Sequence, residues 1–264
     1  MKRSLRVFVI FVAFLVVGVS LEARAALHTE TVEYKQGDTV LVGYLAYDDT
    51  SMERRPGVLV VHEWWGLNDY AKRRAELLAQ KGYIAFALDM YGGGKTTDHP
   101  KQAGEWATFV RQNREVGTQR FLAAYELLRN HQMTERGKIA AIGYCFGGYI
   151  VLAMAQEGVD LRGVVSFHGA LPAGRVEPNT IKAKILVCHG ADDASISYEQ
   201  IRQFQENLRD AQADWQFIVY GGARHGFTNP AADGLGIPTL GYNRNADMRS
   251  WKAMMAFFQE ILGQ

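Results

Sequence analysis

Cys145, Asp193 and His225 are the residues whose types and order could together perform nucleophilic catalysis. A thiolate attacks carbonyl carbon well, but a free cysteine has a pKa of about 8.5 and needs a neighbouring base at neutral pH. An imidazole supplies that base and then protonates the leaving group, while a carboxylate fixes its tautomer. We therefore predict Cys145 as the nucleophile and His225 as the general base. Asp193, which we prefer to Asp192 because of its spacing from Gly190, is the predicted orienting acid.

The run Gly143-Tyr144-Cys145-Phe146-Gly147-Gly148 is a cysteine version of the G-x-S-x-G nucleophile elbow. It follows an apolar run at 137–142 that predicts a buried strand, and it precedes an apolar run at 149–155 that predicts a helix. An elbow requires this strand, sharp turn and helix, because the nucleophile occupies a strained turn. The alternatives are a buried structural cysteine and a phosphate-binding loop, although the glycine spacing fits neither common phosphate motif.

The oxyanion that forms during attack needs two hydrogen-bond donors. We expect one from the backbone N–H of Phe146, directly after the cysteine, and one from the loop after the strand that ends at His62. Within that loop, Glu63-Trp64-Trp65-Gly66, we assign the second donor to the N–H of Trp64. The adjacent pair His62-Glu63 lacks the spacing that places two metal ligands on one helix face, so we expect no metal and no cofactor.

Apolar runs alternate with amphipathic stretches along the chain. This pattern predicts an α/β fold, with a mostly parallel sheet covered by helices on both faces. We expect strands over residues 31–34, 41–47, 57–62, 83–88, 138–142, 163–167, 184–188 and 215–220. We expect helices over residues 69–81, 101–113, 115–131, 149–155, 198–211 and 245–262. The candidate residues follow three different strands in the order Cys, Asp, His, which is the order in α/β-hydrolases.

The first 25 residues have the pattern of a secretory signal peptide. Lys2, Arg3 and Arg6 precede an apolar run from Val7 to Val19, and Ala23-Arg24-Ala25 matches a small-x-small cleavage site. The apolar run is shorter than the roughly 20 residues of a membrane span, and an uncleaved anchor is the alternative. We expect cleavage after Ala25. The remaining chain is then expected to be exported to the periplasm without a stable membrane anchor.

Residues 26–264 are expected to form one α/β-hydrolase domain, because their length suits a single domain and no linker or repeat divides them. Loss of residues 1–25 removes four basic side chains and one acidic side chain, which changes the formal charge from +1 to −2. This near-neutral charge argues against nucleic-acid binding as the main function, since that affinity depends on neutralising phosphates.

The chain has two cysteines, Cys145 and Cys188. Export to an oxidising compartment would permit a disulfide between them, and redox work is a further alternative. Cys188 ends the apolar run Ile185-Leu186-Val187-Cys188, which is typical of a thiol in a buried strand, and the chain has no C-x-x-C motif. The sequence leaves the disulfide open.

Five segments together resemble the dienelactone hydrolase family. They are Gly143-Tyr144-Cys145-Phe146-Gly147-Gly148, His62-Glu63-Trp64-Trp65-Gly66-Leu67-Asn68, Leu88-Asp89-Met90-Tyr91-Gly92, His189-Gly190-Ala191-Asp192-Asp193 and His225-Gly226-Phe227-Thr228-Asn229-Pro230. The resemblance extends from Val32 to the C-terminus. It implies an α/β-hydrolase fold and a triad of Cys145, Asp193 and His225. It also assigns to Glu63 the role of the family's glutamate, which helps to activate the resting cysteine.

The chain departs from the family at the residues that hold the substrate. Dienelactone hydrolases proper bind the substrate carboxylate with two arginines, one soon after the Asp-x-Tyr segment and one soon after the catalytic histidine. The corresponding segments here, Asp89 to Lys95 and His225 to Asn229, contain no arginine. A bidentate carboxylate clamp is therefore absent unless Lys95 or Arg224 substitutes as a point charge.

We expect an exported enzyme of the carboxymethylenebutenolidase type that hydrolyses a small carboxylic ester or lactone through an acyl-cysteine intermediate. Trp64, Trp65, Tyr91 and Phe227 are expected to line an apolar pocket for this substrate. The alternative is a binding protein that retains the hydrolase fold without turnover.

Overall fold

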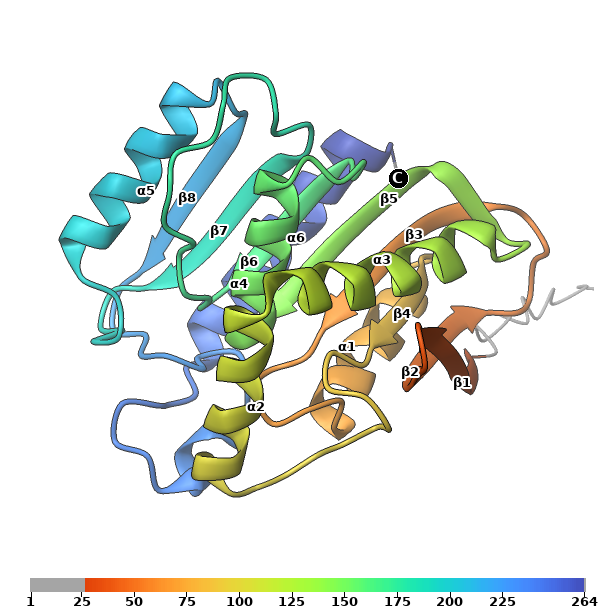
Figure 1. Cartoon of the computed structure of the whole chain (residues 1–264), viewed down its shortest axis with the longest axis horizontal. Coiled ribbons are helices and arrows are strands. Elements are labelled where there is room, and N and C mark those ends of the chain that lie inside the picture. The colour runs from red at the N-terminus through yellow and green to blue at the C-terminus, as the bar shows by residue number, and fades with distance from the viewer. Residues whose placement is uncertain (1–26, 264) are drawn as a thin grey trace, which may run out of the picture.

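The computed structural model describes residues 27–263 (Figure 1), so the predicted signal peptide lies outside the described residues. The strands are β1 (Leu27–Gln36), β2 (Thr39–Asp48), β3 (Arg55–Val61), β4 (Ile84–Leu88), β5 (Thr134–Tyr144), β6 (Gly163–Phe167), β7 (Lys184–Gly190) and β8 (Trp215–Tyr220). The helices are α1 (Asp69–Ala79), α2 (Pro100–Gln112), α3 (Arg114–Asn130), α4 (Phe146–Gln156), α5 (Tyr198–Asp210), the short 3-10 helix η1 (Ala232–Leu235) and α6 (Arg244–Leu262).

The strands form one sheet in the order β1-β2-β4-β3-β5-β6-β7-β8. The β1–β2 hairpin and the β2–β4 pair are antiparallel, and the remaining pairs are parallel. The hairpin turns at Gly37, whose positive φ of 55° suits a residue without a Cβ. The predicted mostly parallel sheet is confirmed, with the antiparallel hairpin at one edge.

Helices cover both faces of the sheet (Figure 1). Along β3, Leu59 and Val61 belong to one hydrophobic cluster, whereas Val58 and Val60 belong to another, because successive strand residues point to opposite faces. The first cluster includes side chains from α2, α3, α4 and α5, and the second includes side chains from α1 and α6. Burial on both faces explains why the parallel strands are nearly continuous apolar runs.

The helices begin at defined residues. The side chain of Asn68 accepts a hydrogen bond from the N–H of Ala71 at the start of α1, and Ser197 and Gln200 form a capping box at the start of α5. Helix α4 begins directly after Cys145, three residues earlier than predicted, because the elbow passes straight into the helix. Among the helices described, none is long and apolar enough to cross a membrane.

The chemically interesting residues lie in loops at one edge of the sheet. Because β3 to β8 run parallel, the loops that follow these strands meet at the same edge. Glu63 follows β3, Cys145 follows β5, Asp193 follows β7 and His225 follows β8. The sheet therefore brings together side chains that are far apart in the sequence.

Candidate active site

Cys145 occupies a strained turn between β5 and α4. Its φ of 55° and ψ of −111° lie in a region that residues with a side chain rarely adopt. A Cβ on Gly143 would collide with the carbonyl of Gly147, and a Cβ on Gly147 would collide with the carbonyl of Val61. The two glycines thus allow the strand, the helix and β3 to approach closely enough to form the elbow.

Cys145, His225 and Asp193 form a continuous hydrogen-bonded chain. The Sγ atom of Cys145 lies 3.0 Å from Nε2 of His225, and Nδ1 of His225 lies 2.8 Å from Oδ2 of Asp193. Nδ1–H donates to the carboxylate, which leaves Nε2 to accept the thiol proton. The structure therefore brings together the three residues that the sequence predicted as nucleophile, base and acid.

The surroundings of His225 stabilise a protonated imidazole at this position. Burial acts to lower the pKa of His225, but the adjacent Cys145 sulfur and the Asp193 carboxylate raise that pKa well above its ordinary value. Burial acts to raise the pKa of Asp193, but hydrogen bonds from His225 and Ser195 lower it to about 2. Asp193 is therefore ionised at neutral pH, and an imidazolium at His225 is stabilised beside the sulfur.

Ser195 fixes the Asp193 carboxylate and was not predicted from the sequence. The Oδ1 atom of Asp193 accepts hydrogen bonds from the N–H of Ser195, at 3.0 Å, and from its hydroxyl, at 2.5 Å. Asp193 is only 4% exposed, whereas the neighbouring Asp192 is exposed. The Asp-x-Ser spacing is the signal that could have identified this contact, because aspartate often accepts from the backbone two residues further on.

Glu63 is buried beside the triad and is held by Asn229. Nδ2 of Asn229 donates to Oε2 of Glu63 at 2.6 Å. Burial raises the pKa of Glu63 to about 7, against the opposing effects of Asn229 and His225. The sulfur of Cys145 is hydrogen-bonded to His225 rather than to Glu63 in this structure. Glu63 therefore lies in the predicted place, with a carboxyl group that changes charge near neutral pH.

The two residues predicted as oxyanion donors, Phe146 and Trp64, line the same cavity as Cys145. Neither backbone N–H donates a hydrogen bond to an acceptor in the described part of the chain. These two amides are thus free to donate to a substrate oxygen.

Cys145 lies in a mostly apolar cavity of about 350 Å³. Residues from several loops line it: Glu63, Trp64, Trp65, Ala107, Arg111, Cys145, Phe146, Ala170, Ser195, Ile196, His225, Gly226, Asn229, Ala232, Leu235, Ile237, Thr239 and Leu240. Trp64 and Trp65 belong to this lining, as the sequence predicted. The volume suits a small organic molecule.

Tyr91 and Phe227 lie outside this lining, which corrects the prediction that they contact substrate. The hydroxyl of Tyr91 donates to the carbonyl of Trp64 at 3.0 Å, and its ring packs against Phe146. Phe227 is fully buried, with its ring against Tyr220. Both aromatic rings are therefore packed in the protein interior, where burial of their apolar surface is favourable.

The cavity takes its permanent positive charge from Arg111 of α2, which the sequence did not indicate. Arg224, a predicted substitute, instead donates to the carbonyl of Pro238 and pairs with Asp233. Lys95, the other predicted substitute, is exposed and is not part of the lining. The positive charge in the cavity therefore comes from Arg111 on helix α2. It does not come from the two loop segments in which the family resemblance places arginines.

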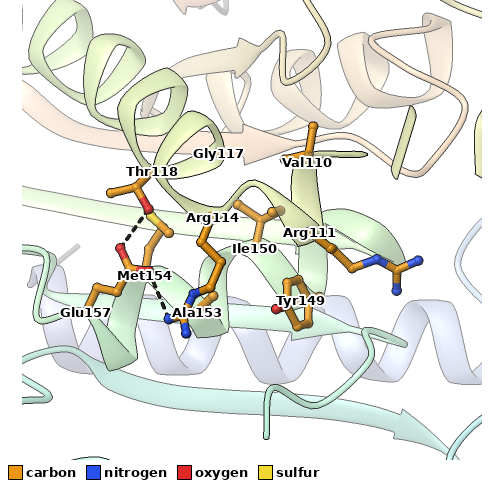
Figure 2. Close-up of a pocket in the computed structure, with 10 residues that line it drawn as sticks. All are labelled: Val110, Arg111, Arg114, Gly117, Thr118, Tyr149, Ile150, Ala153, Met154 and Glu157. Atoms are coloured by element: carbon orange, nitrogen blue, oxygen red, sulfur yellow. Dashed lines mark hydrogen bonds and ion pairs between the residues drawn. The ribbon is translucent and has the colours of Figure 1, made fainter. Parts of the chain in front are cut away.

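Figure 2 shows a small depression between α2, α3 and α4 whose lining includes Arg111 as well as a nearby ion pair. Arg114 pairs with Glu157 at 3.1 Å, and Thr118 also donates to Glu157. Arg111 points away from this pair, on the other side of Tyr149 (Figure 2). Among the residues that the structure describes, Arg111 makes no ion pair, and its guanidinium lies over the ring of Tyr149, 6.0 Å from the ring centre. Its charge is therefore available to a ligand.

Cys188 is a buried structural thiol. It lies in β7, is fully buried, and has its Sγ atom 3.8 Å from the hydroxyl of Tyr220. Burial raises its pKa to about 12. Cys145 and Cys188 are both free thiols, so the disulfide that the sequence left open is absent from this structure.

Known proteins resemble the chain over most of its length. The model of the dienelactone hydrolase family matches residues 41–262. A protein from Aquifex aeolicus (strain VF5) that carries the provisional name carboxymethylenebutenolidase is 27% identical over 240 residues, which cover 88% of this chain and 99% of the relative.

Two solved structures are each 36% identical in sequence to the chain. The dienelactone hydrolase-like promiscuous phosphotriesterase P91 from metagenomic libraries superposes with a TM-score of 0.83, covering 89% of this chain and 98% of that one. The structure named m3DLH superposes with a TM-score of 0.85, covering 90% and 99%. These findings confirm the fold and family that the five sequence segments predicted. The chain belongs to the dienelactone hydrolase family, has the α/β-hydrolase fold and is a carboxylic ester hydrolase.

Proposed function

We propose that the protein hydrolyses a small carboxylic ester or lactone through an acyl-cysteine intermediate on Cys145. The observation that carries the proposal is the hydrogen-bonded chain from Sγ of Cys145 through His225 to Asp193, at 3.0 Å and 2.8 Å. Cys145 and His225 line a mostly apolar cavity. A buried carboxylate, an oriented imidazole and a thiol in contact are the groups that nucleophilic acyl transfer needs.

In the first half of the reaction, the thiolate of Cys145 attacks the carbonyl carbon and forms a carbon–sulfur bond. The carbonyl oxygen becomes an oxyanion, which accepts hydrogen bonds from the N–H groups of Phe146 and Trp64. Collapse of this intermediate breaks the ester carbon–oxygen bond. The leaving oxygen takes its proton from the imidazolium of His225, and the acyl group stays on sulfur.

In the second half, water attacks the thioester carbonyl and gives a proton to the neutral imidazole of His225. Collapse of the second oxyanion expels the thiolate of Cys145 and releases the carboxylic acid. The thiolate–imidazolium pair is thereby restored. Glu63, whose pKa is about 7, lines the same cavity and provides a further proton acceptor there.

The test is hydrolysis of p-nitrophenyl acetate by the wild-type protein and by Cys145→Ala. We expect the substitution to abolish hydrolysis while the circular dichroism spectrum and melting temperature stay unchanged. Mass spectrometry of the wild type mixed with this ester should detect one acetyl group on the peptide that contains Cys145. Full activity in the variant would overturn the proposal. Absence of both hydrolysis and acylation would favour the alternative of a binding protein.

Phosphotriesters are a second candidate substrate class. The observation in favour is the 36% identity to a solved relative whose name describes it as a promiscuous phosphotriesterase. Attack by the same thiolate at phosphorus would place the phosphoryl oxygen near the donors that serve the ester oxyanion. An aryl phosphotriester assayed beside the ester tests this, since Cys145→Ala should lose both activities if one site performs them.

We also propose that residues 1–25 direct export and are then removed. The basic start, the apolar run and the small-x-small site support this proposal. Expression of the full-length chain in a bacterium, followed by N-terminal sequencing of the periplasmic fraction, should identify Ala26 as the first residue. Recovery of the intact chain in the membrane fraction would instead favour an uncleaved anchor.

A further inference from the structure

His168 lies directly behind the nucleophile and was not singled out in the sequence. It follows β6, is fully buried, and has a φ of 42°. This left-handed backbone conformation is unfavourable for a residue with a large side chain, and such outliers persist only where the surroundings enforce them. The side chain is thus held in one place by its contacts.

The contacts of His168 define which of its nitrogens carries the proton. The N–H of Cys145 donates to Nδ1 of His168 at 3.2 Å, and also to the carbonyl of Phe167 at 3.0 Å. A backbone N–H can only donate, so Nδ1 must be unprotonated and the proton must lie on Nε2. Nε2–H then donates to the hydroxyl of Thr228 at 2.7 Å, and that hydroxyl is 2.6 Å from the hydroxyl of Tyr70.

His168 also touches the general base. The rings of His168 and His225 lie 5.4 Å apart at 64°. Burial is the main reason why the pKa of His168 lies well below its ordinary value. The nearby charges of His225 and Arg74 lower this pKa further, and the Asp193 carboxylate acts against them. His168 is therefore neutral beside the imidazolium of His225 and does not compete with it for the thiol proton.

We propose that His168 is a positioning residue for the hydrolytic reaction. Held as the Nε2–H tautomer by Thr228, it fixes the backbone of Cys145 so that the sulfur stays in contact with His225. This inference rests on the proposed function of Cys145 as nucleophile. A small displacement of a reacting group has a large effect on rate, because the approach of sulfur to carbonyl carbon depends steeply on geometry.

The test compares two substitutions of matched shape. Asn in place of His168 presents an oxygen where Nδ1 accepts from Cys145, whereas Leu has a similar shape without an acceptor. Leu also fits the left-handed backbone less well than Asn, so the Thr228 variants below test the same role with His168 unchanged. We expect His168→Leu to lower kcat for p-nitrophenyl acetate about 10- to 100-fold with KM nearly unchanged, and His168→Asn to recover most of the loss. The rate at which iodoacetamide alkylates Cys145, measured against pH, should change in the Leu variant and return towards wild type in the Asn variant.

A second pair of variants keeps the test decisive if the Leu variant does not fold. Thr228→Val removes the hydroxyl that holds the tautomer, and Thr228→Ser keeps it. We expect the first to reduce kcat several-fold and the second to stay within about twofold of wild type. The proposal is overturned if the folded Leu variant, or Thr228→Val in its place, keeps wild-type kcat and alkylation kinetics. It is also overturned if Asn recovers nothing relative to Leu.

The outcomes separate this inference from the proposed function. If Cys145→Ala remains active, the proposed function fails and His168 has no nucleophile to position. If Cys145→Ala is inactive but the His168 and Thr228 variants keep full activity, the proposed function stands and the positioning role fails.

Discussion

At the scale of single residues, substitution of the adjacent aspartates Asp192 and Asp193 should affect ester hydrolysis very differently. Asp193 is buried and bonded to His225, whereas Asp192 is exposed. Asp193→Asn would allow His225 to adopt the wrong tautomer, because an amide can donate to Nδ1 as well as accept from it. We expect kcat for a chromogenic ester to fall about 10²- to 10⁴-fold. Asp192→Asn is the matched control and should stay within about twofold of wild type. Equal losses would contradict the assignment.

The buried carboxyl group of Glu63 makes the stability of the protein depend on pH. Burial raises its pKa from 4.5 to about 7, so the folded state binds this proton more tightly than the unfolded state. The stabilisation from this group is complete at a pH below 4.5 and is lost as the pH rises through about 7. Glu63→Gln keeps an acceptor for Asn229 but cannot ionise. We expect it to raise the free energy of unfolding at about pH 8 by up to about 3 kcal/mol.

Urea denaturation of wild type and Glu63→Gln at acid and alkaline pH measures this difference. The two proteins should differ little at about pH 4.5, where Glu63 is protonated in the folded state. A variant equally stabilised at both pH values would show that the carboxyl group does not titrate as its burial indicates.

At the scale of elements, the approach of α4 to β3 depends on Gly147. Gly147→Ala would push a methyl group into the carbonyl of Val61. We expect a loss of about 1–3 kcal/mol in the free energy of unfolding, and a larger loss of activity because the elbow must move. Gly137→Ala in β5 is the control, since nothing lies within 4 Å of the added carbon. Thermal unfolding and ester hydrolysis of both variants check this, and equal tolerance would contradict it.

We expect helix α2 to contribute specificity through Arg111, which lines the cavity. We expect Arg111→Gln to raise KM about 3- to 10-fold for an ester that carries a carboxylate, because an exposed charge pair contributes about 1 kcal/mol. The KM for a neutral ester of similar size should stay unchanged. Arg114→Gln is the matched control, since Arg114 is already paired with Glu157 (Figure 2). The KM difference should shrink in high salt. An equal change for both esters would mean that Arg111 acts by packing.

At the scale of the whole molecule, Arg74 of α1 ties α6 to the loop after β8. Its guanidinium donates to Asp247 at 2.7 Å and to the carbonyl of Thr228 at 2.5 Å, and its side chain is 8% exposed. Arg74→Met leaves the partly buried Asp247 carboxylate without its cation and the carbonyl of Thr228 without its donor, so we expect a loss of about 2–4 kcal/mol in the free energy of unfolding. Arg73→Met, which breaks the exposed pair with Glu76, should cost at most about 1 kcal/mol. Guanidinium unfolding of the two neighbours measures the contrast.

The order of elements and the three central site residues could be predicted from the sequence. Buried parallel strands are apolar on both faces, so their positions are visible as continuous apolar runs. Gly143 and Gly147 are required at the elbow because neighbouring backbone lies too close for a side chain. Asp193 and His225 follow parallel strands, whose carboxyl ends meet at one edge of the sheet. These features are local in the sequence or follow from topology, which is why the amino-acid order determines them.

The residues that surround this core could not be predicted, because their roles depend on which side chains meet in space. Arg111 reaches the cavity from a helix, Asn229 holds Glu63 across 166 positions, and His168 reaches the N–H of Cys145 from the neighbouring strand end. Tyr91 and Phe227 carry the same aromatic signal as Trp65, yet only Trp65 lines the cavity. The sequence by itself determined the fold and predicted the three residues, Cys145, Asp193 and His225, that the structure brings into contact. The tertiary structure alone decided the surroundings of the nucleophile, because burial and hydrogen-bond partners arise only when distant segments pack together.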